Sequence, residues 1–147
     1  MSGAPRALVL VSIDASVVLP CGDESDAVAV RQCRWAEGEE PLSAAELVER
    51  IVAEAPLVVC LGPDLPESSA LEVAQELDRT RPEISLVWLR TPTADLWQAA
   101  ARAGVRDVID PDAPVEEVRH AIVQAADRAE RLLAAAGADR AVDPGGR

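Results

Sequence analysis

Apolar residues along the chain fall into short continuous runs, separated by longer segments in which they recur every three or four positions. Short runs are typical of strands buried on both faces of a parallel sheet, and the wider spacing is typical of amphipathic helices. The runs predict strands at 7–13, 57–61, 84–89 and 105–109, and a weaker alternation predicts another at 27–35. The wider spacing predicts helices at 43–55, 69–77, 94–103 and 114–136.

Polar residues at the helix boundaries support this assignment. Ser43 with Glu46, and Ser69 with Glu72, have the spacing of a capping box, in which each side chain accepts the other's backbone N–H. Gly104 stands where a helix ends and a left-handed backbone conformation is needed.

Strands that alternate with helices predict an α/β three-layer sandwich around a central parallel sheet of about five strands. The length of the chain predicts one domain over residues 1–137 and a flexible tail over 138–147. Within the domain we expect residues 14–42 to be irregular or atypical, because Pro20 and Gly22 interrupt the place of a first helix.

The composition narrows the classes of function. The formal net charge is −12, so no basic footprint is available for nucleic acid or for an anionic membrane surface. All fourteen basic residues are Arg, and Lys, Asn, Phe and Tyr are absent, a pattern typical of a GC-rich bacterial genome. No signal peptide and no membrane-length apolar segment is recognisable, which favours the cytoplasm and no membrane insertion.

The same composition argues against an enzyme. Without Lys there is no Schiff base and no phosphate-loop lysine. His120 is the only histidine and has no recognisable catalytic partner, and the three cysteines show no metal-binding spacing. We therefore expect no catalytic residues, no cofactor and no metal ligands.

The segment 56–113 resembles the receiver domain of response regulators almost element by element. The sequence PLVVCLGPDLPESSALEVAQEL is similar to the third strand, phosphorylation loop and third helix of a receiver. The sequence ISLVWLRTPTADLWQAAARAGVRDVIDPDAP is similar to the fourth strand through the fifth, and AGVRDVI is its most specific part. This resemblance implies a flavodoxin-like, receiver-like fold.

The resemblance also implies where phosphorylation chemistry would lie. A receiver holds Mg²⁺ with an acidic pair after its first strand, and Ser12 and Ile13 occupy those positions. Gly62 replaces the acceptor aspartate, Thr91 is near the hydroxyl position, and Pro111 replaces the lysine. With three of the four functions missing, we expect a degenerate receiver that is not phosphorylated.

Among receivers of this degenerate, phosphate-independent kind, the chain is similar to the N-terminal receiver-like module of pilus-assembly localisation ATPases. That similarity implies a non-catalytic signalling or localisation module that acts through protein–protein interaction.

A flavodoxin-like sensor of a small ligand or nucleotide is the alternative. Ligands of open α/β sheets bind at the carboxyl ends of the strands, and four candidate side chains follow predicted strands. These candidates are Asp14, Asp64, Arg90 and Asp110.

Two features suggest protein contacts. Trp97 is either core or an exposed interface anchor, since Trp is common in binding hot spots. The last predicted helix carries apolar residues at alternating spacings of three and four, typical of a heptad seam. The seam predicts a homodimer, or docking of a partner helix, through Ala125, Ala129, Leu132 and Ala136. The alternative is that residues 115–125 cover the sheet and the rest of the helix is a solvated extension.

Overall fold

The computed structural model describes residues 6–12, 28–37 and 40–141. The elements in chain order are β1 (Arg6–Ser12), β2 (Val28–Arg34), β3 (Ala36–Glu37), β4 (Glu40–Pro41), α1 (Ala44–Ala53), β5 (Val58–Leu61), α2 (Glu67–Thr80), β6 (Ser85–Leu89), α3 (Ala94–Arg102), β7 (Asp107–Ile109) and α4 (Val115–Ala141).

Five strands form the central sheet in the order β2-β1-β5-β6-β7, and every neighbouring pair is parallel. This confirms the predicted α/β architecture and its strand number. β3 and β4 form a separate antiparallel pair, so part of the stretch that was predicted to be irregular is regular. The remainder of that stretch, residues 13–27 and 38–39, lies outside the described residues.

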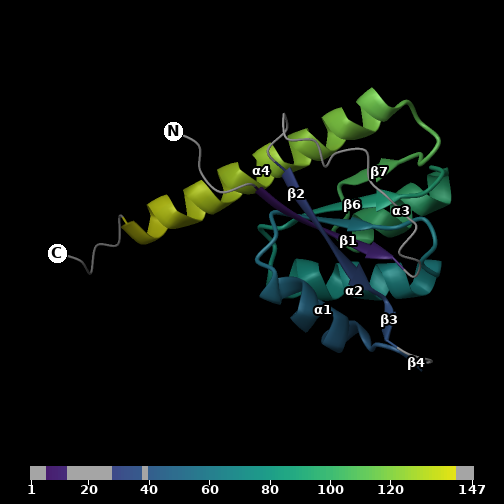
Figure 1. Ribbon diagram of the computed structural model, residues 1–147. Helices are drawn as coiled ribbons and strands as arrows, with labels where there is room; N and C mark the ends of the chain where they lie inside the picture. The colour runs from purple at the N-terminus through teal and green to yellow at the C-terminus, as the bar shows by residue number, and fades with distance from the viewer. Residues whose placement is uncertain (1–5, 13–27, 38–39, 142–147) are drawn as a thin grey trace.

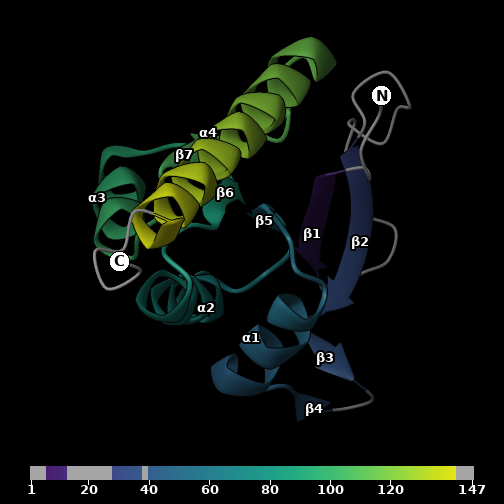
Figure 2. The same ribbon diagram turned by 90° about the vertical axis from the view of Figure 1, so that its left-hand side faces the viewer.

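Helices cover both faces of the sheet (Figures 1 and 2). Helices α1, α2 and α3 pack on one face, where β1 contributes Val9 and Val11 to the larger core cluster. On the other face α4 packs through Val118, Ile122, Ala125 and Ala126 against a second cluster. The alternation of Leu8 and Leu10 with Val9 and Val11 places successive residues of β1 in different clusters, as the period of a strand requires.

The helix boundaries follow local chemistry. The capping box at α1 is present, with Ser43 and Glu46 exchanging side-chain and backbone hydrogen bonds. Gly104 has φ +87° after α3, as predicted. The capping box predicted at Ser69 and Glu72 is wrong, because α2 starts two residues earlier at Glu67, immediately after Pro66.

Helix α4 is the longest element and runs beyond its predicted end, to Ala141 rather than residue 136. At 1.5 Å per residue its 27 residues span about 40 Å, and its C-terminal part projects past the sheet (Figure 1). Within the part of the chain that the structure describes, no helix combines membrane-spanning length with sufficient apolarity.

Candidate functional site

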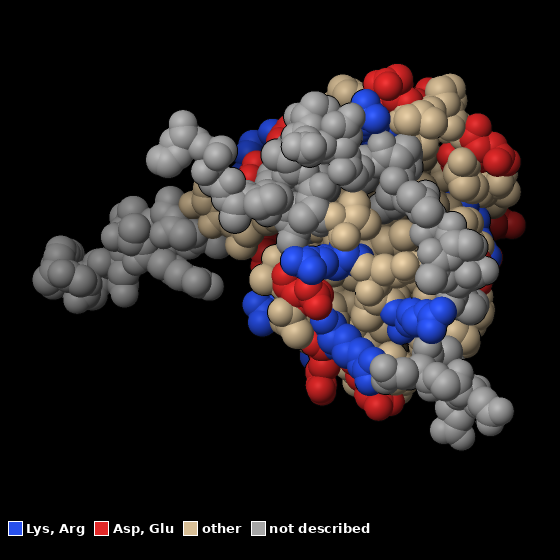
Figure 3. All heavy atoms as spheres, in the orientation of Figure 1, with Lys and Arg blue, Asp and Glu red and all other residues tan. Residues whose placement is uncertain are grey.

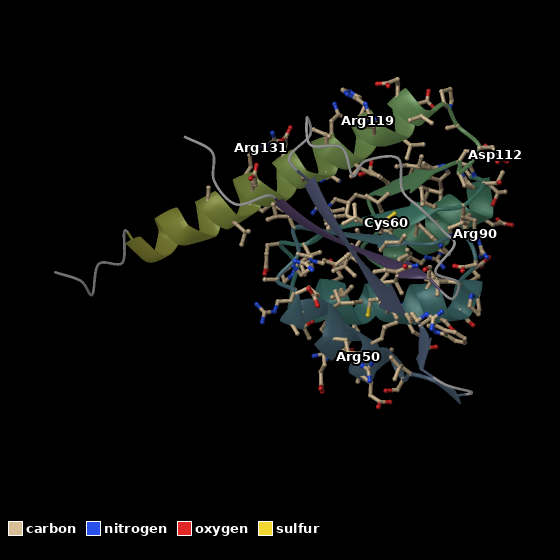
Figure 4. The ribbon with its side chains drawn as sticks, viewed as in Figure 1. Arg50, Cys60, Arg90, Asp112, Arg119 and Arg131 are labelled. Atoms are coloured by element: carbon tan, nitrogen blue, oxygen red, sulfur yellow. The ribbon has the colours of Figure 1, made fainter. Side chains whose placement is uncertain are left out.

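The carboxyl ends of the parallel strands meet at one edge of the sheet, and this edge holds most of the candidate residues. Ser12 ends β1, Gly62 follows β5, Arg90 follows β6 and Asp110 follows β7. In Figure 4 Arg90 and Asp112 lie at this same end of the molecule, whereas Cys60 lies within the sheet. Ile13 and Asp14 lie outside the described residues.

Gly62, where the receiver resemblance implies an acceptor aspartate, is packed against β1. Its N–H donates to the carbonyl oxygen of Val11 over 2.7 Å. A Cβ built on Gly62 would lie 2.8 Å from that same oxygen and 3.2 Å from Ser12 Cβ. The position therefore has no room for a side chain, because real Cβ atoms do not approach that closely.

Ser12 is fully buried beside this contact. Its hydroxyl oxygen accepts a hydrogen bond of 2.6 Å from Gln32 Nε2 on the neighbouring strand β2. Our sequence reasoning missed Gln32, because its proximity to Ser12 depends on the register of β1 with β2, which local patterns do not reveal. A neutral hydroxyl held by an amide thus stands at the end of β1, where the receiver resemblance implies a carboxylate ligand of Mg²⁺.

Asp64 is half-buried in the loop between β5 and α2. Its Oδ1 would lie 3.1 Å from a Cβ on Gly62, so this carboxylate sits beside the glycine rather than at the end of the strand. Within residues 6–12, 28–37 and 40–141, no three His, Cys, Asp or Glu side chains gather closely enough to hold a metal ion. The described residues at this edge thus do not fit the Mg²⁺ of a phosphorylated receiver.

Arg90 fastens the β5–α2 loop to the end of β6. Its Nη2 donates to the carbonyl oxygen of Leu65 over 3.0 Å, and its Nη1 lies 3.5 Å from Glu67 Oε1. The guanidinium also lies over the ring of Trp88, 5.5 Å from the ring centroid, a cation–π distance. The sequence suggested Arg90 only as a candidate ligand residue and gave no indication of its contacts with Leu65 and Trp88. The sequence signal available for this loop was Pro66, which directly precedes Glu67, the first residue of α2.

The other edge residues do not converge on this arrangement. Thr91 and Pro111 are exposed. Asp110 Oδ1 accepts the N–H of Asp112 over 2.9 Å, a local turn contact before α4. Arg90 and Asp110 therefore both hold loops in place. These two side chains give no support to the alternative function of sensing a small ligand.

The candidate interface residues are divided by burial. Trp97 is 42% exposed and Leu132 is 38% exposed. Ala125 and Ala129 are fully buried, so their assignment to an intermolecular seam is wrong. Ala125 packs in the cluster beneath α4, which explains the error, because a helix that covers a sheet shows the same apolar spacing as a coiled coil. The side chain of Ala136 lies outside the described residues.

Comparisons with known proteins show the fold but no family by sequence. No family model matches the sequence, and no curated protein matches it significantly. A protein from Burkholderia pseudomallei described as pilus assembly-related has a similar structure, with TM-score 0.66 and 20% identity, covering 85% of this chain and 92% of that one.

Two receiver domains are similar to a comparable extent. A CheY-like response regulator receiver domain protein from Methanospirillum hungatei gives TM-score 0.62 at 14% identity, over 86% of this chain and 97% of that one. The signal receiver domain of a protein described as a Luxo repressor, from Vibrio parahaemolyticus, gives TM-score 0.66 at 14% identity, over 85% and 92%. The chain therefore has the CheY-like α/β fold of response-regulator receiver domains.

Proposed function

We propose that the chain is a receiver-like signalling or localisation module of the cytoplasm that is not phosphorylated, catalyses no reaction and acts by binding other proteins. One observation carries the proposal: residue 62, at the position of a phosphoryl acceptor, is a glycine packed against the Val11 carbonyl. A nucleophilic carboxylate cannot occupy that place in this packing, and phosphoryl transfer needs both the nucleophile and charge neutralisation around it.

The surroundings of Gly62 support the same function. Ser12 replaces an acidic metal ligand, Pro111 stands at the lysine position, and the chain contains no Lys. The loop that would respond to phosphorylation is instead held by Arg90 through the Leu65 carbonyl. A module built in this way presents a fixed surface to its partners.

The similarity to the pilus assembly-related protein supports a role in localisation during pilus assembly. That protein resembles this chain over 92% of its own length, so the shared region is nearly all of it. We include pilus assembly in the proposal on that ground.

Phosphorylation is tested directly by incubation with acetyl phosphate and Mg²⁺, followed by intact-mass measurement. Fluoride NMR with beryllofluoride provides a second readout that does not depend on the lifetime of an acyl phosphate. A receiver with a complete acidic site, treated in parallel, is the positive control. We expect neither adduct, and a stoichiometric adduct on Asp64 or Asp14 would overturn the proposal.

The proposal also includes self-association through α4, now by the exposed leucines of the helix in place of the buried Ala125 and Ala129. Leu132 and Leu133 are 38% and 43% exposed in the C-terminal half of α4. Helices gain most of their stability from packing an apolar face, so two neighbouring exposed leucines on α4 favour a covering partner. We propose a second copy of the chain as that partner.

A further inference from the structure

The outer side of β2 is a sheet edge that carries arginines, in a chain whose formal net charge is −12. β2 is the terminal strand of the sheet and pairs with β1 along all seven of its residues. Among the described residues, no strand pairs with its other side. An edge strand of this length presents a row of backbone donors and acceptors that another extended segment can use.

The direction of these backbone groups follows from one hydrogen bond. The N–H of Trp35, one residue beyond β2, donates to the carbonyl oxygen of Ser12 over 3.0 Å, so it faces β1. Backbone groups of successive strand residues point to opposite sides, which directs those of Cys33 and Arg31 toward β1 as well. The backbone groups of Gln32 and Arg34 therefore face outward.

A cavity of about 480 Å³ opens beside this edge, between β2 and α1. Val9 and Ala53 contribute apolar lining, and the polar residues are Arg31, Gln32, Arg34, Arg50 and Glu54. Arg31, Arg34 and Arg50 are all exposed. Figure 3 shows basic side chains gathered on this face over β2 and α1, and Figure 4 shows Arg50 on α1 beneath β2.

Among the described residues that line the cavity, three are arginines and one is a glutamate, whereas the chain as a whole has a formal net charge of −12. Arginine forks bind carboxylates in a bidentate manner, which favours an acidic occupant here. The rest of the molecule repels a long polyanion, which disfavours nucleic acid. Charges on an edge strand also prevent aggregation, and the binding experiment below separates that role from recognition of a partner.

We propose that the outer edge of β2 binds an extended acidic segment of a partner protein, which adds to the sheet as a sixth strand. The backbone groups of Gln32 and Arg34 pair with the segment, and Arg31 on β2 and Arg50 on α1, which line the same cavity, bind its carboxylates. This inference rests on the proposed function as an interaction module and names the chemistry of its partner.

The test uses the full chain and a fluorescein-labelled octapeptide in which Glu alternates with Val, measured by fluorescence anisotropy. An octapeptide with Arg in place of each Glu is the charge control. We expect saturable binding of the acidic peptide only, and Arg31→Gln should weaken it by about two- to fivefold, as for an exposed charge pair. Absence of saturable binding by the acidic peptide overturns the proposal.

Two variants of one position separate strand addition from simple charge attraction. Gln32→Pro removes an outward N–H, which edge strands tolerate, and Gln32→Ala removes the same side chain but keeps the N–H. We expect binding to be lost in Gln32→Pro and retained in Gln32→Ala, with circular dichroism showing that both variants are folded. Equal binding by both variants would overturn strand addition. Phosphorylation is measured separately, so failure of this inference and failure of the proposed function are distinguishable.

Discussion

The carbonyl oxygen of Val11 accepts the backbone N–H of Gly62 and lies 2.8 Å from where a Cβ on residue 62 would stand. One contact thus both joins β1 to the start of the β5–α2 loop and excludes a side chain at that point. We therefore expect that residue 62 cannot carry a phosphoryl acceptor, because of its packing as well as its residue type.

We predict that Gly62→Asp does not restore phosphorylation and lowers the free energy of unfolding by about 1–3 kcal/mol, the usual cost of overpacking. Urea unfolding followed by circular dichroism measures the loss. Thr91→Asp, on the exposed loop after β6, is the matched control and should leave stability nearly unchanged. A Gly62→Asp variant as stable as the wild type would show that β1 moves to admit a side chain.

Arg90 is predicted to stabilise the fold through the β5–α2 loop. Arg90→Ala should lower the free energy of unfolding by about 1–2 kcal/mol, because it removes a charge-assisted hydrogen bond to Leu65 and the contact with Trp88. Arg90→Lys should recover only part of this loss, since an ammonium lacks the planar fork.

Arg79→Ala provides the comparison for Arg90. Arg79 pairs with Glu76 on the surface of α2 with 70% of its side chain exposed, so its removal should cost less than about 0.5 kcal/mol. Equal losses in the Arg79 and Arg90 variants would mean that Arg90 does not hold the loop.

Two separate effects are predicted to make a substitution of Gly104 destabilising. Its φ of +87° is unfavourable for a side chain, and a Cβ there would overlap Asp78 Cγ and lie 2.7 Å from Asp78 Cβ. Gly104→Ala should therefore destabilise by about 2–4 kcal/mol, combining backbone strain with overpacking. Adding Asp78→Ala should recover the part of the loss that comes from Asp78 Cγ and Oδ1, while the contact with the Cβ of residue 78 and about 1–2 kcal/mol of backbone strain remain. Thermal unfolding of both single variants and the double variant measures the coupling; additive losses would contradict it.

Association through α4 is predicted to depend on its two exposed leucines, Leu132 and Leu133. We expect the wild type to sediment as a dimer at tens of micromolar, and Leu132→Glu with Leu133→Glu to sediment as a monomer, because two carboxylates oppose burial of that surface. Val115→Glu, at the exposed start of the same helix, should leave the dimer intact. A monomeric wild type would exclude self-association and leave a different partner for this surface.

The fold was predictable from local patterns, whereas the site depends on contacts across the sheet. The buried runs located the four strands β1, β5, β6 and β7 to within a few residues. β7 is shorter than predicted because Val105, read as its first residue, still donates its N–H to Ala100 in the turn after α3. The side chain of Val105 is buried in the core whether the backbone is a turn or a strand. The pattern of apolar residues therefore does not show where the turn ends and β7 begins.

The contacts of the site were less accessible to sequence reasoning. Gly62 could be placed by its distance from Leu65 and Pro66, but the carbonyl beside it belongs to Val11, fifty-one positions earlier in the chain. Likewise, the sequence pattern of α4 did not reveal that Ala129 is buried while Leu132 is exposed, since that depends on where the sheet beneath the helix ends.

The absence of Tyr and Phe gives the three tryptophans a use as optical reporters. Trp88 is fully buried beneath Arg90, Trp35 is partly buried against the larger core cluster, and Trp97 is 42% exposed on α3. All near-ultraviolet aromatic signal of the chain comes from these three indoles, each at a different depth. Emission from Trp88 should therefore be blue-shifted and shielded from iodide, while Trp97 should be quenched, so that single-tryptophan variants report separately on the core and on the surface of α3.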